Sequence, residues 1–168
     1  MQETFAPKSI CFGCGPANGE GLRIRSFESP GPGIGSAPAG ADAKGQGGTR
    51  TVATWSPSPR HQAFPGMLNG GIIGALLDCH SNWAAAMHLM RRNGWDRPHA
   101  TVTAEFKVEL LAPVPSGSPV ELSAEVEEAT ERKAVVSSTL SSGGVVKARC
   151  RATFVAVKEG HPAYHRWE

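Results

Sequence analysis

One stretch of the sequence holds an ionisable group where a chemical function has to be considered. Residues 65–78, PGMLNGGIIGALLD, lead from a loop with two glycines into an apolar helix and then reach Asp78, at a position that leucine would suit. A buried carboxylate without partners is costly and responds by raising its pKa. Asp78 therefore serves either catalysis or a structural bond to a backbone donor or a second subunit, and the residue alone leaves both open.

The two glycines before Asp78 favour the catalytic interpretation. Gly70 and Gly71 open the predicted helix, where unpaired backbone N–H groups bind anions. Without a Cβ, this backbone allows a ligand to approach closely. The amides would meet the negative charge that develops on a substrate carbonyl under attack, as an oxyanion hole does. Asp78, two turns further on, would reach the same carbonyl as a base for water or as a nucleophile.

The helix positions Asp78 on a narrow stripe of small residues. At about 100° per residue, the stripe consists of Gly74, Asp78, Ser81 and Ala85, flanked by Asn82 and His88. Another backbone, a partner subunit or a ligand can come close there. His80 falls on roughly the opposite side and is interpreted as a hydrogen-bonded core histidine.

The predicted elements define the fold class. A helix runs from about residue 69 or 70 to about 92 and is stopped by Gly94. Alternating patterns predict strands at 22–27, 49–55, 101–110, 120–128, 134–140 and 146–156, with a hairpin turn at 141–144. The helix is apolar nearly all round, so it must be buried nearly all round. The sequence therefore predicts an α+β fold: a curled antiparallel β-sheet wrapped around one long central α-helix.

Strict alternation also assigns the side chains of the strand at 101–110. It places Val102, Ala104, Phe106, Val108 and Leu110 on one face and Thr103, Glu105, Lys107 and Glu109 on the other.

A chain of 168 residues fits one domain. We expect an N-terminal Cys-x-x-Cys segment at 1–21 that caps the domain, a single domain at 22–157 with a flexible Gly/Pro-rich loop at 28–48, and a polar C-terminal tail at 158–168. The net charge of +2 and the scattered basic residues argue against nucleic acid as a partner. No apolar run approaches a membrane span, and no export signal is visible, so the expected location is cytoplasmic.

The stretch at 65–78 resembles the helix-start motif of hotdog-fold acyl-CoA thioesterases, in the branch of the phenylacetate-pathway and 4-hydroxybenzoyl-CoA thioesterases. That motif reads Pro-Gly-x-x-His-Gly-Gly, with an acid seven residues after the second glycine, which is the spacing from Gly71 to Asp78. The box at 11–22, with Cys11-x-x-Cys14-Gly15, is similar to an N-terminal box of many members. The order of elements agrees over residues 9–157.

The resemblance implies hydrolysis of acyl-CoA thioesters to the free acid and coenzyme A, with no metal and no cofactor beyond the coenzyme A of the substrate. It makes Asp78 the general base or nucleophile, Gly70 and Gly71 the oxyanion donors, and Thr103 a catalytic hydroxyl that meets Asp78 from the other chain. Members of the family are dimers or tetramers with sites at subunit interfaces. A homodimer or a dimer of dimers is therefore expected.

The sequence departs from the motif at one position, where Asn69 replaces the family's histidine. Asparagine can still donate a hydrogen bond to a carbonyl, but it cannot carry a charge. The remaining substrate-binding candidates are His61, Gln62, Pro65, Gly66 and Asn82. The departure leaves open a non-catalytic protein that binds acyl-CoA or another apolar ligand on the same scaffold, and a purely structural dimeric module.

The cysteines and the basic residues carry weaker signals. A zinc site at Cys11 and Cys14 would need four ligands, and the sequence offers no second pair, so a structural cap is preferred. Cys79 and Cys150 are interpreted as buried packing. Basic candidates for the phosphates of coenzyme A are Arg91, Arg92, Lys133, Arg149 and Arg151.

Overall fold

A computed structural model describes residues 1–29 and 50–168 of the chain. Its main elements are one long helix, α2 (Gly70–Asn93), and a sheet of β1 (Phe27–Ser29), β2 (Arg50–Trp55), β5 (Thr101–Leu110), β6 (Val120–Ala129), β7 (Lys133–Ser142) and β8 (Val145–Ala156). Smaller elements are α1 (Gln2–Phe5), a turn of 3-10 helix at Pro59–His61, and a hairpin of β3 (Gln62–Phe64) and β4 (Met67–Leu68). Apart from residues 28 and 29 in β1, the predicted loop at 28–48 lies outside the described residues.

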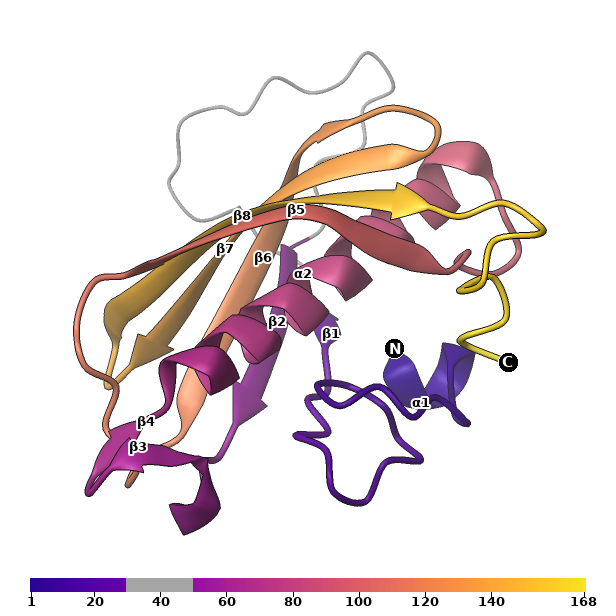
Figure 1. Ribbon diagram of the computed structural model, residues 1–168. Helices are drawn as coiled ribbons and strands as arrows, with labels where there is room; N and C mark the ends of the chain where they lie inside the picture. The colour runs from indigo at the N-terminus through magenta and orange to yellow at the C-terminus, as the bar shows by residue number, and fades with distance from the viewer. Residues whose placement is uncertain (30–49) are drawn as a thin grey trace.

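The sheet has the strand order β1-β2-β6-β7-β8-β5, and every neighbouring pair is antiparallel. It curls around α2, which crosses its inner face (Figure 1). Fourteen helix residues are buried, because the sheet covers most of the helix surface. The predicted α+β architecture, a curled antiparallel sheet around one long central helix, is confirmed. In the described part of the chain, no helix has both the length and the apolar character needed to cross a membrane.

Both ends of α2 follow from local sequence. Asn69 is the N-cap, and its side-chain oxygen accepts hydrogen bonds from the backbone N–H groups of Gly71 and Ile72. Gly94 ends the helix in the left-handed conformation with φ = 66°, which glycine adopts without a steric cost. The predicted bounds of the helix are therefore confirmed, as are the strands at 101–110 and at the C-terminal hairpin. Gly143 and Gly144 of that hairpin turn have φ values of 60° and 76°.

The strand predicted at 22–27 is wrong over most of its length, because β1 begins only at Phe27. The preceding residues instead bond to the N-terminal loop. The backbone N–H of Leu22 donates to the carbonyl of Phe12, and that of Ile24 donates to the carbonyl of Gly13. Buried and exposed side chains still alternate here without a strand. The pattern therefore predicted the burial correctly, but the backbone bonds to the N-terminal loop and not to a neighbouring strand.

The strand β5 contains a bulge that the alternating pattern did not predict. Thr103 lies opposite Phe154 and Glu105 lies opposite Thr153, so two residues on β5 span one step on β8. Ala104 is the extra residue. The bulge moves Thr103 onto the face that carries Phe106, the face toward α2, and the predicted placement of Thr103 on the opposite face is wrong.

The two ends of the chain pack against the helix close to one another (Figure 1). The ring of Trp167, from the segment predicted as a polar tail, is 4% exposed and stacks on Trp83 with the ring centroids 4.6 Å apart. At the N-terminal end, Gln2 and Ser26 form a buried hydrogen-bonded pair. The terminal segments therefore close the side of the helix that the sheet leaves open.

The Gln2–Ser26 pair contacts His80, which is fully buried. Its Nδ1 lies 2.9 Å from the hydroxyl of Ser26, and its Nε2 lies 3.2 Å from the carbonyl oxygen of Thr51. Because a carbonyl only accepts, Nε2 carries the proton and Nδ1 accepts from Ser26. Burial lowers the pKa of His80 to about 4, against the hydrogen bond to Thr51, which raises it. The prediction of a satisfied core histidine is confirmed.

Candidate active site

A cavity of about 590 Å³ lies between the first turns of α2 and strand β5. Most of its wall is apolar or small side chains, and one carboxylate and one hydroxyl face into it. The lining residues are Gly70, Gly71, Gly74, Ala75, Asp78, Thr103, Phe106, Val108 and Leu110. The structure therefore gathers four of the five predicted catalytic residues around one space, and only Asn69 is missing from the lining.

Asp78 and Thr103 form the polar pair of this cavity. The hydroxyl of Thr103 donates a hydrogen bond of 2.8 Å to Oδ1 of Asp78. Both residues belong to the same chain, so the contact needs no second subunit, contrary to the predicted arrangement across an interface. The bulge at Ala104 is the reason the contact exists, since without it Thr103 would point away from the helix. Oδ2 of Asp78 makes no hydrogen bond with the described residues and is available for a water molecule.

The electrostatics of the cavity favour proton uptake by Asp78. Burial raises the pKa of the Asp78 carboxyl, the largest of four influences. The hydrogen bond from Thr103 lowers it, the charge of Cys11 raises it, and the charge of Arg166 lowers it. Arg166 comes from the C-terminal segment and also donates to the carbonyl of Thr101. A carboxylate that is partly withdrawn from water and held at one oxygen is suited to act as a base.

The start of α2 offers one backbone amide to a ligand. The N–H of Gly71 donates to Oδ1 of Asn69 at 2.8 Å, so the helix cap engages it. The N–H of Gly70 makes no hydrogen bond among the described residues, and Gly70 lines the cavity. A substrate carbonyl could therefore accept a hydrogen bond from the Gly70 N–H directly. It could accept one from the Gly71 N–H by displacing the side-chain oxygen of Asn69, which is also a carbonyl oxygen.

Asn82, predicted as a substrate contact, lies outside the cavity lining and makes a structural contact. Its side-chain amide donates to the carbonyl of Thr101 at 3.3 Å, and its Oδ1 accepts from the hydroxyl of Thr101 at 2.9 Å. Asn82 is 6% exposed and lies one turn after Asp78. Together with the Asp78–Thr103 bond, this pair holds α2 against the beginning of β5 and fixes the geometry of the cavity.

The loop candidates before the helix also lie outside the cavity lining. The ring of His61 contacts that of Trp55 in a tilted arrangement, with the centroids 4.9 Å apart, and its Nδ1 accepts from the backbone N–H of Ser58 at 3.0 Å. Burial is the main cause of its lowered pKa. Gln62 accepts from the N–H of Gly66 at 3.1 Å and so closes the β3–β4 hairpin.

Pro65 and Gly66 form the exposed turn of that hairpin, where Gly66 has φ = 83°. In the isolated chain, neither residue lines the cavity that holds Asp78.

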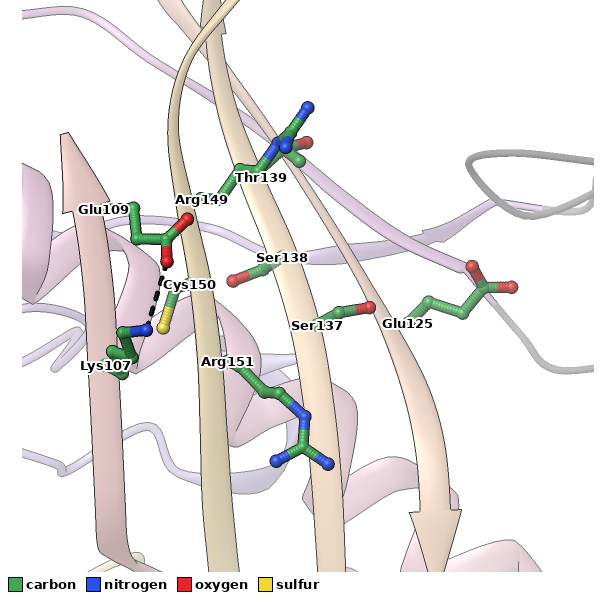
Figure 2. Close-up of a pocket in the computed structure, with 9 residues that line it drawn as sticks. All are labelled: Lys107, Glu109, Glu125, Ser137, Ser138, Thr139, Arg149, Cys150 and Arg151. Atoms are coloured by element: carbon green, nitrogen blue, oxygen red, sulfur yellow. Dashed lines mark ion pairs between the residues drawn. The ribbon is translucent and has the colours of Figure 1, made fainter. Parts of the chain in front are cut away.

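A second hollow, of about 380 Å³, lies on the outer face of the sheet (Figure 2). Within its lining, Lys107 pairs with Glu109 at 3.2 Å, and Arg151 pairs at 2.9 Å with Glu127, which lies outside the lining. Arg149, a phosphate candidate together with Arg151, lies on this face as well. The sheet therefore lies between these two arginines and Asp78.

Three cysteines meet beside the cavity, which the spacing in the sequence did not predict. The sulfur atoms of Cys11, Cys14 and Cys79 all lie within 4.8 Å of one another, and all three residues are free thiols. No local pattern predicts this contact, since Cys79 lies 68 residues after Cys11 and on a different element. Among the described residues, this is the one cluster whose donor atoms could hold a metal ion.

Comparison with known proteins places the chain in a family. A model of the thioesterase superfamily matches residues 65–149, which include the helix start, Asp78 and Thr103. The match covers half of the chain, and the fold is the hotdog arrangement of one long helix in a curled antiparallel sheet. The chain therefore belongs to the thioesterase superfamily. No curated protein matches it.

Solved structures agree with this assignment. A thioesterase superfamily protein from Shewanella loihica is 34% identical, with a TM-score of 0.54 over 65% of this chain and 84% of that one. A protein of lower identity, 14%, is the putative thioesterase YhdA from Lactococcus lactis, with a TM-score of 0.61 over 80% of this chain and 92% of that one. The PaaI protein from the phenylacetic acid degradation operon of E. coli is 16% identical, with a TM-score of 0.54 over 65% and 73%. The last two show the fold alone.

Proposed function

We propose that this protein hydrolyses acyl-CoA thioesters to the free acid and coenzyme A. The observation that carries the proposal is the Asp78–Thr103 pair, which faces an apolar cavity at the start of a helix. Membership of the thioesterase superfamily supplies the class of bond that is broken. The apolar wall of Phe106, Val108 and Leu110 suits the acyl group of such a substrate.

The proposed reaction uses the two oxygens of Asp78 differently. Thr103 holds Oδ1, while Oδ2 accepts a proton from a water molecule whose oxygen attacks the thioester carbon. The carbonyl oxygen becomes an oxyanion, which the Gly70 N–H stabilises, joined by the Gly71 N–H when Asn69 releases it. The intermediate then collapses with cleavage of the C–S bond, and the leaving thiolate recovers the proton from Asp78. No metal ion enters these steps.

The direct test is a panel of acyl-CoA substrates with detection of the released thiol. Wild-type protein should release coenzyme A from at least one member with an apolar acyl group, and Asp78→Asn should release it about 10²–10⁴-fold more slowly. Asp96→Asn is the matched control, because Asp96 is an exposed carboxylate after the end of α2. No thiol release from any substrate, or equal release by Asp78→Asn, would refute the proposal.

A second candidate, a non-catalytic binding protein for acyl-CoA, is favoured by one observation. The Gly71 amide is already engaged by Asn69, which leaves a weaker oxyanion hole than two open amides would. Such a protein would show a thermal shift with a non-hydrolysable acyl-CoA analogue while releasing no thiol from the panel. Thiol release that depends on Asp78 excludes this candidate.

We also propose that the chain self-associates as a homodimer or a dimer of dimers. The edge strand β5 carries Phe106 and Leu110, which are 43% and 57% exposed at the wall of the cavity. Large exposed apolar side chains at a sheet edge favour cover by another chain. Light scattering of the purified protein should give a multiple of 17.7 kDa, and a monomer at micromolar concentration would contradict this.

A further inference from the structure

The three cysteines beside the cavity come from two parts of the chain that are far apart in sequence. Cys11 and Cys14 lie in the N-terminal loop, and Cys79 lies on α2 directly after Asp78. The sulfur atoms of Cys11 and Cys79 are 3.7 Å apart. Cys14 and Cys79 are 4% and 7% exposed, while Cys11 is partly open to solvent. The cluster is therefore nearly closed, with its accessible side at Cys11.

The N-terminal loop is held in a shape that presents its sulfurs to the helix. A Cβ at Gly13 would lie 2.3 Å from the sulfur of Cys79, and a Cβ at Gly15 would lie 2.4 Å from the carbonyl oxygen of Ser9. Both positions therefore require glycine for close packing. The N–H of Gly15 donates to the carbonyl of Cys11 at 2.8 Å, which closes the turn that contains both loop cysteines. The cluster is preorganised by the backbone around it.

We propose that Cys11, Cys14 and Cys79 form a three-thiolate site for a thiophilic metal ion, with Zn²⁺ as the expected occupant. Zinc–thiolate bonds of about 2.3 Å in tetrahedral geometry place neighbouring sulfurs about 3.8 Å apart. The Cys11–Cys79 separation of 3.7 Å matches that value, whereas a disulfide needs about 2 Å. This pair thus has the spacing of two ligands around an ion, and the sulfur of Cys14 lies within 4.8 Å of both.

The surroundings of the cluster also suit a bound ion. The indole N–H of Trp83 points at the sulfur of Cys14 at 3.4 Å, a hydrogen bond of the kind that orients thiolate ligands in metal sites. The three thiolates leave one tetrahedral position, which a water molecule or a small external ligand would fill from the open side at Cys11. Soft sulfur donors select zinc over the hard ions magnesium and calcium.

A metal ion at this place would tie the N-terminal segment to the helix that carries Asp78. Cys79 follows Asp78 in the sequence, and the box at 11–22 lies far from it along the chain. The ion would stabilise the packing of these two parts of the chain. It would not contact Asp78, whose carboxylate faces the cavity and accepts a hydrogen bond from Thr103. The proposal concerns metal binding and stability, so it stands or falls independently of thioester hydrolysis.

The test uses the reduced, full-length protein after treatment with a chelator. Zn²⁺ is added in competition with a chromophoric chelator, and Co²⁺ is used in parallel as a spectroscopic probe. We expect about one ion per chain, a thiolate-to-cobalt charge-transfer band, and a thermal midpoint that rises on addition of Zn²⁺. Binding should be unchanged in Asp78→Asn, which separates this result from the test of catalysis.

Matched cysteine variants locate the site. Cys79→Ala should lose the charge-transfer band and the thermal shift, while Cys150→Ala should keep both, because Cys150 is equally buried but lies on β8 outside the cluster. If Cys79→Ala does not fold, Cys11→Ala gives the same test at the more exposed position. Absence of binding to wild-type protein, or equal binding by the Cys79→Ala or Cys11→Ala variant and wild type, overturns the proposal.

Discussion

Replacement of Thr103 by valine tests the Asp78–Thr103 pair more sharply than any other single change. Valine has nearly the same shape and suits a strand, so the fold should persist. The change removes one hydrogen bond, the 2.8 Å bond from the Thr103 hydroxyl to Oδ1 of Asp78. Asp78 would then lose the group that fixes its orientation toward the attacking water.

The size of the effect follows from the kind of bond that is lost. A hydrogen bond to a charged group contributes about 1.5–3 kcal/mol. At about 1.4 kcal/mol for each tenfold change in rate, kcat should fall about ten- to a hundredfold. The lower part of that interval is expected, since Thr103 is exposed to the cavity and water can take its place. KM should change less than kcat, because the cavity wall is unchanged.

Steady-state kinetics with the best acyl-CoA of the panel measures both constants. Thr103→Ser keeps the hydroxyl and should recover most of kcat. Thr139→Val is the matched control, because Thr139 lies on the outer face of the sheet. A Thr103→Val enzyme with wild-type kcat would show that the bond does not position Asp78, and the assigned role of Thr103 would be wrong.

Three further changes test other parts of the reasoning. Asp78→Asn should lower kcat by about 10²–10⁴-fold, the usual contribution of a general base, while Asp96→Asn leaves it unchanged; comparable rates for the two would remove Asp78 from the chemistry. Asn69→Ala removes the cap of α2 and should lower the free energy of unfolding by about 1 kcal/mol, which corresponds to a fall of about 2–4 °C in the thermal midpoint. Most activity should remain, because Asn69 does not line the cavity. A collapse of kcat with little loss of stability would instead make Asn69 a substrate contact. His80 has a folded pKa of about 4 against about 6.5 when unfolded, so the unfolded state binds more protons between these values and stability falls as pH drops through that window. Urea unfolding at about pH 7 and about pH 4.5 should show wild type losing about 2 kcal/mol more than His80→Gln, and parallel losses would refute the linkage.

Much of the architecture could be predicted from local signals. The start and end of α2 are determined by Asn69 and Gly94, whose effects act within one turn of the helix. The hairpin at Gly143 and Gly144 is likewise local, because a turn with positive φ at two consecutive residues strongly favours glycine. The strand at 22–27 was predicted wrongly because alternation reports burial, and it does not identify the backbone that accepts the hydrogen bonds.

The residues of the candidate site also differ in whether local spacing or tertiary packing determines their position. Asp78, Gly70 and Gly71 could be identified from spacing along one helix, and the structure places them in one cavity. The loop candidates, among them His61, could not be placed, since a residue count gives no distance across a loop. Asn82 lies on the helix, but whether its side chain bonds a ligand or Thr101 depends on where β5 packs.

What the sequence alone determined is everything that depends on neighbours along the chain: the helix with its caps, the turns, and an acid two turns from a glycine pair. What only the tertiary structure decided is which distant groups meet. The bulge at Ala104 turns Thr103 toward Asp78, and the packing of the N-terminal loop on α2 brings Cys11 to Cys79. No tight turn joins β5 to β8, so the register of this pair and the packing of the N-terminal loop depend on long-range contacts that no short stretch of residues encodes.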